Sequence, residues 1–261
     1  MAAGPTAVAF EDVTKTFERP DGSGPFTAVD RLSFKVARGE IVAVLGKTGC
    51  GKSTIFNLIA GLAEPTSGHV AVEGLDPFGE FAALRGKIGI VFQGDRLMPW
   101  RTALDNVLLG FDILGVQRAR SEPAALGWLT KLGLAGHERD YPHALSGGMR
   151  QRVSIARALA VDPELILCDE PFSALDEMTA RRLRAEFLRL VRDSAKTALF
   201  ITHSIDEAME VGDRIMVLRR PARIALEAGV GEPLSSDRKA ELRTQIMRVL
   251  ADEGEPESAL T

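Results

Sequence analysis

Cysteine is scarce in this chain, which has only Cys50 and Cys168 among its 261 residues. A small secreted domain stabilised by disulfides has more cysteines in framework spacing, so we expect a reducing, cytoplasmic setting. The chain also lacks any run of about 18 apolar residues, and residues 1–10 contain no basic segment followed by an apolar one. We therefore predict that it does not cross a membrane alone, and that any membrane role comes through a partner.

Neither sign of charge is in large excess. The formal net charge is −4 and the isoelectric point is about 5.7, so the whole chain has no net attraction for nucleic acid and we expect no nucleic-acid partner. Arg181, Arg182 and Arg184 are interpreted as a solvated helix face. The length suffices for one large α/β domain, or for a core with a small subdomain.

The pattern of apolar residues predicts an α/β fold with a mostly parallel, helix-covered sheet. Alternating apolar and polar residues near the N-terminus indicate antiparallel strands at 8–17 and 32–36, joined by a Pro/Gly-rich loop at 18–26. Further strands are expected at 41–45, 69–72, 87–92, 165–168, 198–202 and 215–218, and helices at 53–62, 179–194, 205–211 and 238–250.

Helical periodicity extends from residue 104 to about residue 159, with expected breaks at Pro123, at Pro142 and at the glycine pair 147–148. This pattern predicts an inserted helical subdomain at about 95–159. The main domain is then expected to cover residues 1–231, and a helical tail residues 232–261.

A glycine-rich segment lies between the predicted strand at 41–45 and the predicted helix at 53–62, the order that a phosphate-binding loop requires. Residues 46–53 match the pattern GxxxxGK[ST]. The alternative, a glycine turn that binds no ligand, is weakened by the flanking strand and helix. The residues expected to contact a nucleotide are Gly46, Lys47, Thr48, Gly49, Cys50, Gly51, Lys52, Ser53 and Thr54.

In a loop of this kind the main-chain amides surround the β-phosphate. Lys52 is expected to neutralise oxygen atoms of the β- and γ-phosphates, and the hydroxyl group of Ser53 to coordinate Mg²⁺. The motif therefore predicts ATP and Mg²⁺ as ligands.

Residues 145–152 read Leu-Ser-Gly-Gly-Met-Arg-Gln-Arg, a pattern expected to end a turn and begin a helix. Ser146 can cap that helix, while Gly147 and Gly148 allow the main chain to approach a ligand closely. The exposed amides and the helix dipole attract an anion, so we interpret this segment, with Gln151, as a second phosphate site. A chain with two half-sites needs a second copy of itself to use both, which predicts an ATP-driven dimer.

Two adjacent acids, Asp169 and Glu170, follow the predicted buried strand at 165–168. Ligands of open α/β sheets bind at the carboxyl ends of the strands. We expect Asp169 to reach the metal, usually through water, and Glu170 to hold and deprotonate the attacking water. The alternative, in which the two acids only end the strand and cap the next helix, is weaker because a phosphate loop precedes them.

Together these motifs resemble those of the nucleotide-binding subunits of ATP-binding cassette (ABC) transporters, and the resemblance covers nearly the whole chain. It implies a P-loop NTPase fold with a RecA-like core, an N-terminal antiparallel β-subdomain and the inserted helical subdomain. It also implies roles for four further residues. These are Gln93 as a sensor of metal and water, His203 as a γ-phosphate contact, Asp176 at the dimer contact and Phe17 stacked on adenine.

Two of these roles depend on the resemblance alone, since Phe17 by itself would be read as a core side chain and His203 as a local hydrogen-bonding group. The chain also departs from the family pattern in two places. Ser204 follows the histidine where aspartate is common, and Lys47 and Thr48 replace the usual Pro-Ser or His-Ser pair. We expect neither departure to abolish hydrolysis.

The segment 93–102, with its Pro99-Trp100 pair, is similar to importer subunits for nitrate, sulfonate, taurine and related small ions. In transporters this region forms a groove for a coupling helix of the permease, so Leu97, Met98 and Trp100 would be docking contacts. The alternative is that Trp100 packs within the helical subdomain. We expect no substrate site in this chain, since selectivity belongs to the permease and to an extracytoplasmic solute-binding protein.

Three function classes remain. The first is an importer ATPase at the cytoplasmic face of the inner membrane, in which two copies enclose two ATP molecules, each between Lys52 of one copy and Ser146, Gly147 and Gly148 of the other. The second is a cassette ATPase for lipid transport or efflux, with the same chemistry and a different membrane partner. The third, a soluble cassette protein acting on ribosomes or DNA, resembles two fused cassettes or one split by a long coiled coil, and this chain has neither feature.

Overall fold

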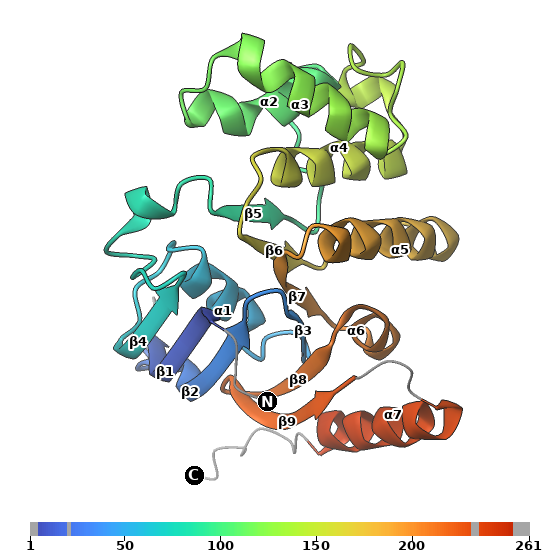
Figure 1. Ribbon diagram of the computed structural model, residues 1–261. Coiled ribbons are helices and arrows are strands. Elements are labelled where there is room, and N and C mark those ends of the chain that lie inside the picture. Colours follow the sequence, from blue (N-terminus) through green and yellow to red (C-terminus); the bar gives the residue numbers. More distant parts are fainter. Residues whose placement is uncertain (1–4, 20–21, 231–234, 253–261) are drawn as a thin grey trace. The chain divides into compact units, whose positions relative to one another are not determined.

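The protein is described by a computed structural model, which covers residues 5–19, 22–230 and 235–252 (Figure 1). The chain forms two compact units. One consists of Met1–Glu80 with Phe200–Thr261, and the other of Phe81–Leu199. Within the described ranges, no helix is both long enough and apolar enough to span a membrane.

The first unit contains a three-stranded antiparallel sheet in the order β2-β1-β4. Its strands are β1 (Thr6–Phe17), β2 (Phe26–Ala37) and β4 (Ser67–Val72). Phe10 of β1 pairs with Phe34 of β2, and their rings stack with centroids 4.5 Å apart. The predicted antiparallel strands and the intervening loop are confirmed, although residues 20–21 of that loop lie outside the described residues.

The same unit also holds a parallel strand pair that leads into the glycine loop. Every residue of β3 (Ile41–Leu45) is buried, and β3 pairs in parallel with β8 (Arg214–Arg219). An antiparallel partner, β9 (Arg223–Gly229), follows β8. The sequence-based expectation omits β9 because its residues alternate between exposed and half-buried, so no apolar run marks it. The helices of this unit are α1 (Lys52–Ile59), α6 (Ile205–Val211) and α7 (Ser236–Ala251).

In the second unit, β5 (Ile88–Val91) pairs in parallel with β6 (Leu165–Asp169). β6 is followed in the sheet order by β7 (Thr197–Thr202), whose last three residues belong to the first unit. The helices are α2 (Ala103–Ile113), α3 (Arg118–Lys131), α4 (Gly147–Ala160) and α5 (Glu177–Asp193), with 3-10 turns at Phe81–Leu84 and Pro142–Ala144.

The helices α2, α3 and α4 pack on one another in the predicted helical region. The expected break at Pro123 is wrong, since this residue lies inside α3. A proline in a helix removes one main-chain hydrogen bond, and the helix continues because Ala125 and Leu129 are fully buried. Pro142 lies between α3 and α4, where it begins a 3-10 turn.

The predicted tail helix is confirmed as α7, with Leu242 and Ile246 buried. Arg243 of α7 forms an ion pair with Asp206 of α6. The Nε of Arg219 donates a hydrogen bond to the main-chain oxygen of Val249, at 3.1 Å. The expected boundary at 231/232 lies outside the described residues.

Candidate nucleotide-binding site

The ammonium group of Lys52 is held inside the glycine loop that follows β3. Its Nζ donates hydrogen bonds to the main-chain oxygens of Gly46, at 2.6 Å, and Lys47, at 2.9 Å. The side chain is only 7% exposed, although Lys47, Thr48 and Gly49 are exposed. The loop therefore presents a fixed positive charge below an accessible rim.

Two glycines of this loop are required by close packing. Gly51 has a φ of +106°, and a Cβ there would lie 2.5 Å from the main-chain oxygen of Ala28 and 2.7 Å from the Cβ of Ala222. A Cβ at Gly46 would lie 2.5 Å from the Sγ of Cys50. Side chains at either position would displace the loop, so both glycines are needed for the loop's shape.

The loop leads into the N-terminus of α1, to which no side chain in the described ranges forms a capping hydrogen bond. Its main-chain amides and the helix dipole suit a bound phosphate. Ser53, in the first turn, is exposed. No group of three or more His, Cys, Asp or Glu side chains in the described part of the chain could hold a metal ion. A site in which Ser53 and phosphate oxygens share the ion fits Mg²⁺, which retains most of its water.

In the second unit, Glu170 follows the end of β6 with a left-handed main chain, at φ +44°. The amide of Ser173, at 3.2 Å, and its hydroxyl group, at 2.9 Å, both donate to the main-chain oxygen of Glu170. Such a conformation costs a non-glycine residue about 1–3 kcal/mol and is concentrated at functional sites. The acids do not cap the next helix, because Asp176 caps α5 by accepting a hydrogen bond from the amide of Thr179, at 3.0 Å.

The N-terminus of α4 is built from the Leu-Ser-Gly-Gly motif. The hydroxyl group of Ser146 accepts a hydrogen bond from the amide of Met149, at 3.3 Å, so the predicted cap is confirmed. Ser146 and Gly147 are exposed, and a Cβ at Gly148 would lie 3.1 Å from the Cγ2 of Thr179. The motif thus presents bare main chain at an exposed helix N-terminus.

Side chains of α4 also form hydrogen bonds with the segment that follows β5. Gln151 is 4% exposed, and its Nε2 donates to the main-chain oxygen of Phe92, at 3.4 Å, next to the exposed Gln93. Arg150 binds the carboxylate of Asp95, with Nε and Oδ2 2.9 Å apart. A third contact joins Arg157 to the main-chain oxygens of Asp95 and Arg96, at 2.8 and 2.7 Å.

Sequence reasoning did not find the roles of Arg150 and Arg157. Their separation of seven residues, which places them on one helix face, was the available signal. With Gln151, they attach the segment after β5 to α4.

His203 is exposed and directly follows β7. The hydroxyl group of Ser204 accepts a hydrogen bond from the amide of Glu207, at 3.2 Å, and caps α6. Thr202, in turn, donates to the carboxylate of Glu207. Serine and aspartate are both good caps, so Ser204 can cap the helix as an aspartate at this position would.

The two aromatic side chains with predicted contacts both lie at the surface. Phe17, at the end of β1, is 42% exposed, and the Nζ of Lys15 lies 5.0 Å from its ring centroid. Trp100 is 72% exposed, so the alternative in which it packs within the helical region is wrong. Leu97 is instead buried, at 9% exposure, so its use as a docking contact is not supported, whereas Met98 is half-buried.

Residues 29–173 match the family model for ABC transporters. This chain belongs to the ABC transporter family. Its cassette binds and hydrolyses ATP. The family explains why the chain carries both a phosphate loop and a Leu-Ser-Gly-Gly helix, and it confirms the fold class predicted from the sequence.

Related proteins align with this chain over most of its length. The chain is 43% identical to the taurine import ATP-binding protein TauB of Yersinia pestis, over 73% of this chain and 73% of that protein. It is 40% identical to the bicarbonate transport ATP-binding protein CmpD of Synechocystis, over 81% of this chain and 73% of that protein. The dimeric post-hydrolysis structure of the ATP-binding cassette MJ0796, bound to ADP and Pi, matches with a TM-score of 0.76 and 33% identity, over 86% of this chain and 99% of that chain.

Proposed function

We propose that this ABC subunit powers the uptake of a small anion through a membrane permease, to which it binds peripherally at the cytoplasmic face of the inner membrane. The similarity to TauB and CmpD supports this proposal above all, at 43% and 40% identity. Taurine and bicarbonate are both small molecules with an acidic oxygen group. An extracytoplasmic solute-binding protein would deliver the anion to the permease.

In this proposal, the main-chain amides of residues 46–54 surround the phosphates of ATP, and Lys52 neutralises the β- and γ-phosphates. Phe17 stacks on the adenine ring. Ser53, Asp169 and Gln93 would hold Mg²⁺, with Asp169 acting through water. The bound Mg²⁺ would neutralise charge on the transferred phosphoryl group.

Glu170 is the general base of the proposed reaction. It takes a proton from water, whose oxygen then bonds to the γ-phosphorus while the bond to ADP breaks. His203 contacts the γ-phosphate and Gln93 reports its presence to the permease. The restrained main chain of Glu170 supports this role, because a base must be held at a fixed position.

A second copy of the chain completes the site. Ser146 and Gly147 are exposed at the N-terminus of α4. There they can contact a phosphate bound to another copy, and Gly148 and Gln151 belong to the same proposed phosphate site. Asp176 lies at the contact between copies. The dimeric MJ0796 structure supports this arrangement, and an interface related by two-fold symmetry would contain two such sites.

The exposed indole of Trp100 is the proposed contact for the permease, with Met98 beside it. Tryptophan is enriched in the anchoring positions of protein interfaces.

The proposal is tested by purifying tagged Glu170→Gln with ATP from detergent-solubilised native membranes, followed by mass spectrometry. We expect a multi-span permease to co-purify. When Trp100→Ala is combined with Glu170→Gln, we expect less of this permease to be recovered. Reconstituted in vesicles, that permease with the wild-type subunit should show ATPase activity stimulated by one of taurine, nitrate or bicarbonate in the presence of its binding protein. Recovery only with ribosomes, DNA or soluble factors would overturn transport.

A further inference from the structure

The turn between β8 and β9 packs directly against the glycine loop. The Cβ of Ala222 lies 2.7 Å from where a Cβ of Gly51 would be. The amide of Ala222 donates to the main-chain oxygen of Ala28, at 2.8 Å, and its own oxygen accepts from the amide of Asp30, at 3.3 Å. The turn is therefore fixed between β2 and the loop.

Next to these contacts, the two segments carry a stacked pair, Phe26 of β2 and Arg220 of the turn. The guanidinium carbon of Arg220 lies 5.1 Å from the centroid of the Phe26 ring. Phe26 precedes Ala28 by two residues in an extended strand, a distance of about 7 Å. Phe26 also pairs with Phe17 in the β1–β2 ladder. The pair thus lies between the glycine loop and the exposed ring of Phe17.

Positive charge surrounds these two rings. Lys15 lies over Phe17, and Arg19 lies over Phe26 at 5.7 Å. The N–H groups of the exposed Arg220 make no hydrogen bond to any residue in the described ranges. Stacking occupies only the face of a guanidinium group, so its donors at the edge stay available to bind oxygen atoms.

We infer that Arg220, stacked on Phe26, is a further nucleotide-binding residue, whose N–H groups bind oxygens of the ribose and α-phosphate of ATP. This segment of the nucleotide joins the base, at Phe17, to the phosphates held by the glycine loop. The inference rests on the proposed assignment of those two contacts.

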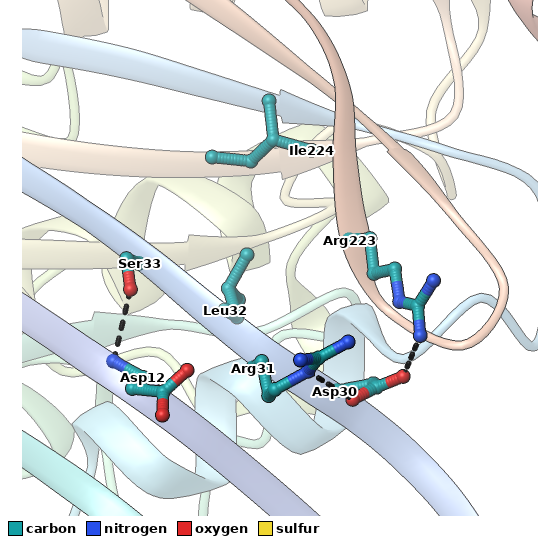
Figure 2. Close-up of a pocket in the computed structure, with 7 residues that line it drawn as sticks. All are labelled: Asp12, Asp30, Arg31, Leu32, Ser33, Arg223 and Ile224. Atoms are coloured by element: carbon teal, nitrogen blue, oxygen red, sulfur yellow. Dashed lines mark hydrogen bonds and ion pairs between the residues drawn. The ribbon is translucent and has the colours of Figure 1, made fainter.

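A neighbouring arginine, at the start of β9, provides a matched control. Arg223 forms an ion pair with Asp30 at the wall of a cavity of about 460 Å³. Figure 2 shows the Asp30 carboxylate between the side chains of Arg223 and Arg31. Arg223 is therefore already engaged by protein, whereas Arg220 is stacked with its edge open.

The experiment is calorimetric titration of ATP with Mg²⁺ into Glu170→Gln, alone and combined with Arg220→Ala, Arg220→Lys or Arg223→Ala. We expect Arg220→Ala to weaken binding about 2- to 5-fold, the size of the contribution from an exposed charge pair. The loss should shrink at high salt, and Arg220→Lys should restore part of the affinity. In the active enzyme, Arg220→Ala should raise KM by a similar factor and leave kcat unchanged, while Arg223→Ala should change neither.

Equal ATP affinity with and without Arg220→Ala would overturn the inference. An equal loss from Arg223→Ala would also overturn it, because the effect would then reflect damage to the turn. Lys52→Ala separates this inference from the proposed function. If that variant kept full ATP affinity, the assignment of the glycine loop itself would fail.

Discussion

Gln151 and Phe92, which are 59 positions apart, are joined by a hydrogen bond of 3.4 Å from the side-chain amide to the main-chain oxygen. Gln151 belongs to the helix that begins with the Leu-Ser-Gly-Gly motif, and Phe92 immediately precedes Gln93. The helix of the proposed second phosphate site and the segment that carries the proposed sensor, Gln93, are thus joined by a hydrogen bond within one unit. A shift of α4 is expected to move the main chain at Gln93.

Gln151→Ala should lower the free energy of unfolding by about 1 kcal/mol, because the main-chain oxygen of Phe92 loses a donor. It should also slow hydrolysis while ATP binding persists. Urea unfolding and phosphate release measure the two effects. Gln93→Ala is the control for stability, since this side chain is exposed and its loss should leave unfolding unchanged. Identical unfolding curves for wild type and Gln151→Ala would show that the hydrogen bond does not contribute.

Glu170→Gln should bind ATP and form dimers with it, yet hydrolyse it at least ~100-fold more slowly, the lower end of a general-base contribution. Phosphate release gives the rate, and size-exclusion chromatography with and without ATP gives the dimer. Glu177→Gln is the control, because Glu177 is a nearby exposed carboxylate in the first turn of α5. If Glu170→Gln stayed monomeric in the presence of ATP, this result would count against the proposed pairing of two copies.

Lys52→Ala should lose ATP affinity about 10- to 100-fold, since a hydrogen bond to a charged group contributes about 1.5–3 kcal/mol. Calorimetric titration measures the loss. Lys47→Ala, at the exposed rim of the loop, should have the smaller effect. Undiminished binding by Lys52→Ala would remove this residue from the site.

The cap of α5 should give a pH-dependent contribution to stability. The amide of Thr179 lowers the pKa of Asp176 below its ordinary value of 3.8. A pKa lowered by folding means that the contribution is complete above the unfolded value and is lost as the pH falls through the folded value. Asp176→Asn keeps a capping side chain and removes the titration.

Urea unfolding of the wild type and of Asp176→Asn between pH 5 and pH 2 measures this contribution. The two proteins share all other carboxylates, so the difference between them reports Asp176. The wild type should lose more stability than Asp176→Asn once the pH falls below about 4. Parallel losses in the two proteins would contradict the prediction.

Local pattern was sufficient for much of the fold and of the site. Helix α6 begins and ends at the predicted residues, and Ser146 caps α4 as expected, because cap, apolar period and turn residues all lie within a few positions. Strand β9 could not be found this way, since none of its residues is buried. The break predicted at Pro123 does not occur, because the burial of one face of α3 outweighs the unfavourable helix propensity of proline.

Contacts between distant positions were beyond sequence reasoning. The bond between Gln151 and Phe92, and the stacking of Arg220 on Phe26, depend on how separate elements meet. Neither residue pair has a spacing that a periodicity could reveal. The family pattern predicts the motif residues, but the hydrogen bonds and packing contacts that position them are visible only in the folded structure.

The C-terminal helix α7 is part of the framework that supports the segment after His203. It packs against β8 and β9 with Leu242 and Ile246 at 2% and 0% exposure, and Arg243 pairs with Asp206, which lies three residues beyond His203. Shortening the protein before Ser236 would expose apolar surface and remove the cation that faces Asp206. Affinity tags and fusion partners should therefore be attached beyond Ala251, and a truncated version should not serve as the minimal ATPase.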